Sequence, residues 1–383
     1  MVAKHATAVM FYDWIKAYQD FPFDLPTLSR RISRHFDTAT GEQIGESAPP
    51  FLAEGSYCTS FRIHVVGRRI TVDGNPSRIN RLDNVFGLAT LADCFKVINS
   101  ILLELGLPCM TPCTTSQRLQ DGSAHVVDGV VLQRLDLTSN FFVGQGNERA
   151  YLRGISSQRY RHSIGYLYPD GNTVVWTPKG GEKAGRLVYP GNYAKAAELD
   201  AHLLQKVLRT FGSDSDEYRY VKELRDWCAA VGMVRAEIKL RAEFLKRERL
   251  CYWGLFEEEK LAAVHSDFLK VGDEMTLDAH DVASISQELV RQGICKSIQA
   301  AGRTASYAYE WMNGAIFDFE KSSVKTHRAR LRRIGLDIKT PYDCTRHCVV
   351  FIHNVREVQR DFNISTPAFY RHAVVPSHLR LVA

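Results

Sequence analysis

The sequence predicts an α+β fold, with an antiparallel sheet backed by helices in the first part of the chain and a helical domain in the second. Short segments of alternating apolar and polar residues, separated by turn residues, fill much of the first part, as antiparallel strands require. Helical periodicity replaces this alternation after about residue 255. With 383 residues, of which 45% are hydrophobic, the chain can bury two cores. We place the domains at residues 1–255 and 256–383.

The first predicted elements are a hairpin and a helix. Residues 59–66 alternate, a turn at Gly67 reverses the chain, and residues 70–72 form the returning strand. A helix follows, because Thr90 is a suitable N-cap and the apolar pattern runs to Leu105 before a glycine and a proline end it.

Four further strands and another helix complete this part of the chain. Residues 130–138 alternate, and residues 162–168 and 173–177 flank a Pro-Asp-Gly-Asn turn that predicts a hairpin. Residues 193–211 have a helical pattern. The clearest strand is 233–242, which places apolar residues on one face and charged residues on the other.

The composition allows a polyanionic partner without requiring one. Lys and Arg number 49 against 43 Asp and Glu, a net charge of +6. No apolar run reaches membrane-spanning length, and the N-terminus lacks the pattern of a signal peptide. We therefore expect a cytoplasmic protein without a membrane partner. Nine cysteines, an odd number without framework spacing, are interpreted as reduced thiols, although Cys109/Cys113 and Cys344/Cys348 leave a zinc site open.

Two strands carry polar side chains suited to metal binding. Arg134 and Asp136 share one face of their strand, and Arg235 and Glu237 share the polar face of theirs. Carboxylate oxygens are ligands that Mg²⁺ and Mn²⁺ prefer. The alternative is that each pair forms an ordinary surface salt bridge on a solvated face.

A tyrosine lies at the start of the predicted helix 193–211. The phenol of Tyr193 has an ordinary pKa near 10, so it needs a base, a cation or a metal-polarised target to act as a nucleophile. Lys195 lies two residues away and offers positive charge or a phosphate contact. From spacing alone, packing is the favoured interpretation of one tyrosine among 16.

Several motifs occur in a fixed order, and together they resemble a known family. The chain is similar to the replication initiators of filamentous bacteriophages, the gene II/X family of phage and plasmid replication proteins. The similarity runs from about residue 55 to 250 and more weakly to the C-terminus. The motifs that carry it are Asp73-Gly74-Asn75-Pro76, Asp83-Asn84-Val85-Phe86-Gly87, Arg134-Leu135-Asp136-Leu137-Thr138, residues 157–169, Tyr193-x-Lys195-x-x-Glu198-Leu199 and Val234-Arg235-Ala236-Glu237.

The resemblance implies a rolling-circle nickase fold and a site-specific endonuclease. Such a protein nicks one strand of the replicative-form duplex at the origin and stays joined to the 5′ phosphate through a tyrosine. It leaves a 3′ hydroxyl for the host polymerase, acts with a host helicase, and later rejoins the single-stranded product. The resemblance implies that Tyr193 is the nucleophile, that Asp136 and Glu237 bind Mg²⁺ or Mn²⁺, and that Arg134, Lys195 and Arg235 hold phosphate.

The sequence departs from better-known nickases in its histidines, and it carries a second tyrosine near Tyr193. Those enzymes carry two histidines separated by one hydrophobic residue, and this sequence has no such triplet. His162 is a candidate third ligand, although a structural role is the favoured interpretation. Tyr189 lies four residues before Tyr193, but Pro190-Gly191 between them argues against one helix. Tyr189 is therefore the runner-up nucleophile.

A basic helix is predicted in the second domain. Ser322 or Ser323 can cap its N-terminus, and Gly335 ends it. A groove- or phosphate-contacting helix and a solvated charged face are both consistent with its composition. Two other functions remain open for the whole chain, namely an origin-binding regulator that does not cut DNA and a mobilisation relaxase. The candidate DNA-binding residues of the helix are Lys325, Arg328, Arg330 and Arg332.

Overall fold

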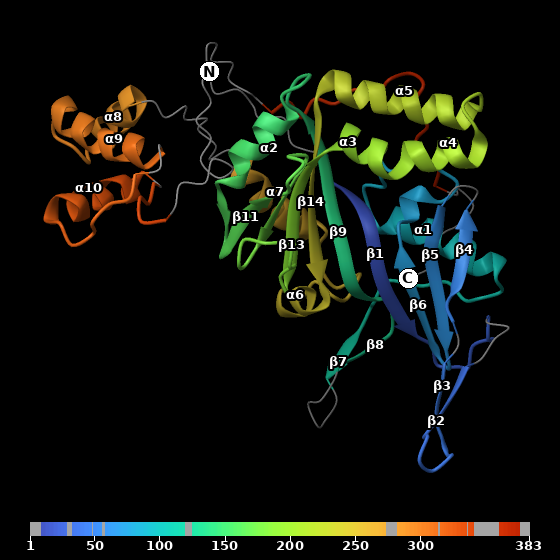
Figure 1. The fold of residues 1–383 in the computed structure, drawn as a ribbon. Coiled ribbons are helices and arrows are strands. Elements are labelled where there is room, and N and C mark those ends of the chain that lie inside the picture. Colours follow the sequence, from blue (N-terminus) through green and yellow to red (C-terminus); the bar gives the residue numbers. More distant parts are fainter. Residues whose placement is uncertain are drawn as a thin grey trace.

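A long antiparallel sheet dominates the computed structural model (Figure 1), and the predicted α+β class is confirmed. The model describes residues 9–28, 33–47, 49–55, 58–118, 125–272, 282–312, 315–334, 336–340 and 360–375. Within these residues ten strands follow the order β10-β11-β12-β13-β14-β9-β1-β6-β5-β4, with antiparallel pairing throughout. They are β1 (Phe11–Asp20), β4 (Phe51–Gly55), β5 (Cys58–Val66), β6 (Arg69–Gly74), β9 (Val131–Phe142), β10 (Arg159–Tyr160), β11 (Ser163–Leu167), β12 (Thr173–Thr177), β13 (Val188–Ala194) and β14 (Met233–Arg241).

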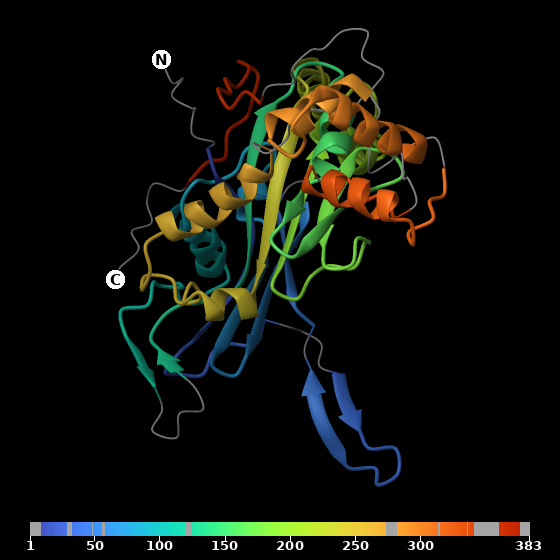
Figure 2. The ribbon, with the colours of Figure 1, turned by 90° about the vertical axis from the view of Figure 1, so that its left-hand side faces the viewer.

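Two small ribbons extend from the sheet. Strands β2 (Ser33–Phe36) and β3 (Gln43–Ser47) form one, and β7 (Ser116–Arg118) and β8 (His125–Val127) form the other. Figure 2 shows the β2–β3 hairpin reaching well beyond the end of the sheet.

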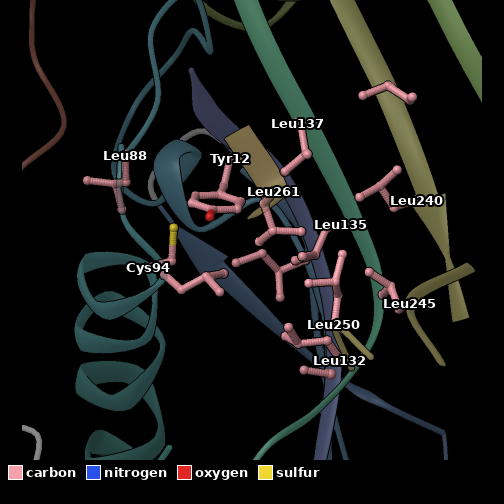
Figure 3. Close-up of a cluster of buried hydrophobic side chains, with 14 of the residues drawn as sticks. Tyr12, Leu88, Cys94, Leu132, Leu135, Leu137, Leu240, Leu245, Leu250 and Leu261 are labelled. Atoms are coloured by element: carbon pink, nitrogen blue, oxygen red, sulfur yellow. The ribbon is translucent and has the colours of Figure 1, made fainter. Parts of the chain in front are cut away.

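One face of the sheet carries the main hydrophobic core. The alternating apolar residues of β9 and β14 point to this face, where the helices α1 (Leu91–Glu104), α2 (Glu148–Ser156), α6 (Ala242–Arg247) and α7 (Glu259–Leu269) cover them. Figure 3 shows a part of this core, in which Leu135 and Leu137 of β9 lie near Leu261 of α7, with Leu240 of β14 beside Leu245 of α6. Thr90 caps α1 as predicted, accepting a hydrogen bond from the Asp93 N–H.

In the described part of the chain, helices cover the opposite face at one end only (Figure 1). Helix α3 (Lys195–Leu199), a π-helical turn (Asp200–Leu204), α4 (Gln205–Phe211) and α5 (Asp216–Val231) form a layer there with its own core. This layer, called the α3–α5 layer below, crosses one end of the sheet in Figure 1. Short 3₁₀ turns occur at Pro76–Arg78 and Lys270–Gly272.

A helical bundle follows the sheet, but its limits differ from the predicted division at residue 255. Helices α8 (Val282–Arg291), α9 (Ile298–Met312) and α10 (Ser322–Arg333) share a separate core. Helix α7, which the sequence assigned to the helical domain, packs into the core of the sheet. The chain also returns to the sheet after the bundle, because Asp361 bridges to Phe142 of β9 and Tyr370 joins the α3–α5 core.

Some predicted element boundaries are wrong. Tyr193 lies near the end of β13 and helix α3 begins at Lys195, so the helical pattern starts two residues later than expected. Pro190 lies inside β13. Strand β12 pairs with β13 only from Gly191 onward. Pro190 has no N–H, and because β12 does not pair with this position, no hydrogen bond to β12 is lost. Helix α10 begins at Ser322, but Lys321 holds its N-cap position and no side chain caps it, so the prediction of a serine cap is wrong.

Other expectations concern cysteines and membranes. Cys94, Cys109, Cys113, Cys228, Cys251 and Cys295 are free thiols. Gly335, Cys344 and Cys348 lie outside the described residues. In the described part of the chain, no helix has the length and apolar character needed to cross a bilayer.

Adjacent leucines of α1 provide a test of the core. Leu102 is fully buried and Leu103 is 47% exposed. Leu102→Ala should lower the free energy of unfolding by about 2–5 kcal/mol, because it removes buried methyl groups and leaves a cavity. Leu103→Ala should change it by less than about 0.5 kcal/mol. Urea denaturation of both variants measures the difference, and equal effects would contradict the packing of α1.

Candidate active site on the polar face of the sheet

Strand pairing brings the predicted functional residues onto one face. Tyr193 of β13 lies opposite Arg235 of β14. Glu237 and Lys239 follow on β14 at two-residue steps, and Lys239 lies opposite Asp136 of β9. Directly opposed residues, and residues two apart in one strand, point to the same side of a sheet. All five side chains therefore lie on the polar face, close to the edge of the α3–α5 layer.

Tyr193 and Glu237 form a direct contact. The Tyr193 hydroxyl donates a hydrogen bond of 3.2 Å to Oε2 of Glu237. Burial and the Glu237 charge raise the pKa of Tyr193 well above its ordinary value, while Arg235 acts in the opposite direction. The phenol is thus neutral at rest, and a carboxylate oxygen is placed to accept its proton.

Lys195 begins the helix that follows Tyr193, and its side chain is fully buried. Its Nζ donates to Oε2 of Glu198 at 2.6 Å and to Oδ1 of Asn84 at 2.8 Å. It lies 6.0 Å from the Tyr193 ring centroid. Burial lowers the pKa of Lys195, and the Arg235 charge lowers it further. The predicted proximity of a cation to Tyr193 is present, inside the protein rather than at its surface.

Arg235 has a different environment from the one expected for a phosphate contact. Its side chain is fully buried. The guanidinium donates to Oδ1 of Asn140 at 3.0 Å and to the carbonyl oxygens of Asn84 and Val85, each at 2.6 Å. The α3–α5 layer covers this end of the polar face, so Arg235 anchors the connector at residues 84–85 and is not presented to a ligand.

Asp13 and the two asparagines beside it are site residues that the sequence analysis did not identify. Asp13 lies where the β1–β9 register shifts between Tyr12 and Trp14. Its Oδ1 accepts hydrogen bonds from Nδ2 of Asn75 at 2.8 Å and of Asn84 at 2.9 Å. Both asparagines belong to motifs that carry the family resemblance, which was the available signal. The sequence gives no comparable signal for Asp13, because the alternation of apolar and polar residues that identifies a strand is broken at a register shift.

Asp136 and Arg134 form a two-pronged ion pair on β9. Arg134 donates to both carboxylate oxygens of Asp136, at 2.8 and 2.6 Å. The Asp136 side chain is 3% exposed and that of Arg134 is 33% exposed. Burial raises the pKa of Asp136 to about 7 despite the Arg134 charge, and Glu237 adds to the rise. Lys239 pairs with the other Glu237 oxygen, Oε1, at 3.2 Å.

Comparison with known proteins shows the family of the chain. The model for the N-terminal part of the gene II-type replication-associated protein matches residues 12–275, and the model for its C-terminal part matches residues 289–376. The chain belongs to this family of replication-associated proteins. The replication-associated protein of Escherichia phage If1 is 40% identical over 326 residues, which cover 83% of this chain and 98% of that relative. No solved structure matches the chain. The resemblance to gene II-type initiators of filamentous phages is confirmed.

The donor chemistry of this site suits a hard cation. Among the described residues, no three His, Cys, Asp or Glu side chains are arranged to hold a metal ion. Asp136 and Glu237 nevertheless present carboxylates on one face. Thr138 lies opposite Glu237, and its buried hydroxyl has no hydrogen-bond partner within the described ranges. Mg²⁺ is commonly held by one or two carboxylates together with substrate phosphates and water, so these donors fit Mg²⁺ or Mn²⁺.

Of the two other candidates, His162 lies away from this group, whereas Tyr189 lies at its edge, opposite Lys239. His162 is exposed in the turn between β10 and β11, and β12 and β13 separate that hairpin from β14. The structure therefore does not bring His162 to Asp136 and Glu237. Tyr189 shares the face of β13 with Tyr193, but it lies four positions earlier, about 13 Å along the strand. Its ring lies 5.9 Å from Nζ of Lys239.

The basic residues of α10 divide into two groups. Arg328 donates to both carboxylate oxygens of Asp337, at 2.7 and 2.9 Å, and Arg330 donates to Oγ1 of Thr304 at 3.4 Å. Both are partly buried. Lys325 and Arg332 are 58% and 63% exposed. Each of these two also pairs with a carboxylate, Lys325 with Glu320 at 3.2 Å and Arg332 with Asp337 at 3.8 Å.

Two arginines on the polar face of β14 test the anchoring role of Arg235. Arg235→Met should lower the free energy of unfolding by about 3–5 kcal/mol, because it removes the donors to the 84–85 connector and leaves Asp13 near an uncharged side chain. Arg241→Met, at the exposed end of the same strand face, should change it by less than about 0.5 kcal/mol. Urea denaturation distinguishes them, and a stable Arg235→Met protein would show that the anchor is dispensable.

Proposed function

We propose that the chain is a site-specific single-strand DNA endonuclease and strand transferase that initiates rolling-circle replication of a phage or plasmid. The observation that carries the proposal is the Tyr193–Glu237 hydrogen bond on the polar face, beside the buried charges of Arg235 and Lys195. Membership of the family of replication-associated proteins supports a role in replication. Replicative-form duplex DNA, single-stranded DNA, and a host polymerase and helicase are the partners that this function would need.

The chain's own residues supply a nucleophile and a base. The Tyr193 oxygen attacks the scissile phosphorus while Oε2 of Glu237 accepts the phenolic proton. A bond from tyrosine oxygen to phosphorus forms, the bond to the 3′ oxygen breaks, and that oxygen takes a proton from solvent. The products are a 5′-phosphotyrosine and a free 3′ hydroxyl. Joining is the reverse: a 3′ hydroxyl attacks the phosphotyrosine and releases its proton to solvent, the bond from tyrosine oxygen to phosphorus breaks, and Glu237 returns the proton to Tyr193.

A divalent cation completes the proposed chemistry. Asp136 and Oε1 of Glu237 would hold Mg²⁺ or Mn²⁺, which would supply positive charge to the scissile phosphate. Arg134 and Lys239 neutralise these same carboxylates in the structure. They are therefore placed to hold the site together before the cation and the substrate arrive.

The polar face also offers a path for the strand next to the cut. Arg241 of β14 lies opposite Arg134 of β9, Arg134 opposite Lys16 of β1, and Lys16 opposite Asp73 of β6. Arg62 of β5 continues this row beyond Asp73. Four cations and one carboxylate thus cross five neighbouring strands on the face of the nucleophile. A positively charged track of this kind attracts the backbone of single-stranded DNA.

The nucleophile assignment predicts a clear loss of function. Tyr193→Phe should lower nicking of supercoiled replicative-form DNA in Mg²⁺ by at least about 10³-fold and abolish the covalent adduct. Tyr189→Phe is the matched control and should remain active. Denaturing gels of end-labelled origin strands report the adduct. Wild-type protein that binds the origin without forming an adduct would favour the non-cleaving regulator, and an active Tyr193→Phe enzyme would rule out the assignment.

The pKa of Asp136 predicts the pH dependence of cleavage. A cation needs the ionised carboxylate, and its pKa of about 7 means that this form accumulates as pH rises through 7. The cleavage rate should therefore increase between pH 6 and 8. Arg134→Gln removes a charge that lowers this pKa, so its profile should shift to higher pH. Single-turnover rates across pH measure both, and an unshifted Arg134→Gln profile would contradict the role of Asp136.

The exposed cations of α10 predict a separable DNA-binding function. Lys325→Gln with Arg332→Gln should flatten the salt dependence of duplex binding by up to about two units of slope, since each lost phosphate contact removes roughly 0.9. Cleavage of a short single-stranded origin oligonucleotide should stay unchanged, because the nucleophile lies on the sheet. Filter binding across salt concentrations gives the slope. An unchanged slope would mean that this helix face is only solvated.

A further inference from the structure

The segment that follows the helical bundle closes over a connector of the active site. Tyr370 is 6% exposed, and its ring packs edge-on against Phe86 with the centroids 5.3 Å apart. Its hydroxyl donates to Oδ1 of Asp83 at 3.2 Å and accepts from the Phe86 N–H at 3.0 Å. Arg81 also donates to this hydroxyl. Tyr370 therefore holds the connector at residues 83–86 at several points.

The same connector contacts the site from its other side. Asn84 donates to Oδ1 of Asp13 at 2.9 Å and accepts from Nζ of Lys195 at 2.8 Å. Its carbonyl oxygen and that of Val85 accept from Arg235. A shift of this connector would move the partners of Asp13, Lys195 and Arg235 together.

Asp83 transmits the constraint between the two sides. Its Oδ1 accepts from the Val85 N–H at 2.9 Å, and its Oδ2 accepts from the Tyr220 hydroxyl at 2.9 Å. The Asp83 side chain is 1% exposed and pairs with Arg81 at 3.3 Å. Removing the Tyr370 hydroxyl would take one donor from Asp83 and leave the Phe86 N–H without its acceptor, which favours movement of the connector.

We propose that Tyr370 is a positioning residue for the Tyr193 site, acting through Asp83 and Asn84. Its hydroxyl fixes the 83–86 connector so that Asn84 holds the Asp13 carboxylate and the Lys195 ammonium beside the nucleophile. This inference rests on the proposed function. Tyr370 belongs to the part of the chain that matches the C-terminal family model, and Tyr193 to the part that matches the N-terminal one. Neither part alone contains the complete site.

The test compares two buried tyrosines in the full-length chain. Tyr370→Phe keeps the ring and removes the hydroxyl. Tyr160→Phe is the matched control, because Tyr160 is 4% exposed and its hydroxyl contacts a carboxylate, that of Asp267, away from the connector. Tyr370→Phe should lower kcat for cleavage of a single-stranded origin oligonucleotide by roughly tenfold or more with little change in KM, since small misplacements of a site are costly. Tyr160→Phe should leave kcat unchanged.

A double variant tests the route of the effect. Asn84→Ala should lower kcat, and adding Tyr370→Phe should lower it little further if both act on one element. Full additivity, or a Tyr370→Phe kcat equal to that of Tyr160→Phe, would overturn the inference.

Hydrogen exchange keeps the inference separate from the proposed function. The Val85 and Phe86 amides should exchange at least tenfold faster in Tyr370→Phe than in wild type, and at the wild-type rate in Tyr160→Phe. This readout needs no catalysis. A wild-type protein that forms no adduct would end the proposed function, whereas unchanged amide exchange in Tyr370→Phe would end the positioning role.

Discussion

Two positive charges are buried where the α3–α5 layer meets the polar face of the sheet. Arg235 and Lys195 have no exposed surface, and an uncompensated buried charge costs several kcal/mol. Arg235 is compensated by the carbonyl oxygens of the 84–85 connector and by Asp13 at 3.9 Å, and Lys195 by Glu198 and Asn84. The geometry of the candidate site follows from this requirement, because the groups that neutralise the two cations also surround Tyr193.

The same constraint explains why Tyr193, the proposed nucleophile, lies at the end of a strand. Strand β13 ends at Ala194 and α3 begins at the next residue. This places Tyr193 opposite Arg235 and puts the buried ammonium of Lys195 near its ring. The phenol remains in hydrogen-bonding reach of Glu237. In the sheet, backbone hydrogen bonds to β12 and β14 fix the residues on both sides of Tyr193. A tyrosine within a helix would have no such paired strands beside it.

Local patterns predicted much of the fold and part of the site. Alternation identified β14, and the cap at Thr90 identified α1. The shared face of Arg134 and Asp136 also followed from alternation. The burial of Arg235 could not be predicted in this way. It depends on where a helix from a distant part of the sequence covers the strand, and local patterns do not contain that information.

The remaining differences have the same origin. Asp13 lies in a register shift, which breaks the alternation used to find strands. Tyr370 lies in a segment without regular secondary structure that returns to the sheet from beyond the bundle. Helix α7 has ordinary helical periodicity, which says nothing about whether it packs on the sheet or in the bundle.

The central claim is that Tyr193 becomes joined to DNA. The most direct measurement is mass spectrometry of the protease-digested adduct formed between the full-length protein and its origin strand in Mg²⁺. The account predicts a nucleotide-modified peptide whose fragment ions place the phosphodiester on Tyr193. Modification of Tyr189 or of any other residue, with Tyr193 unmodified, would contradict it.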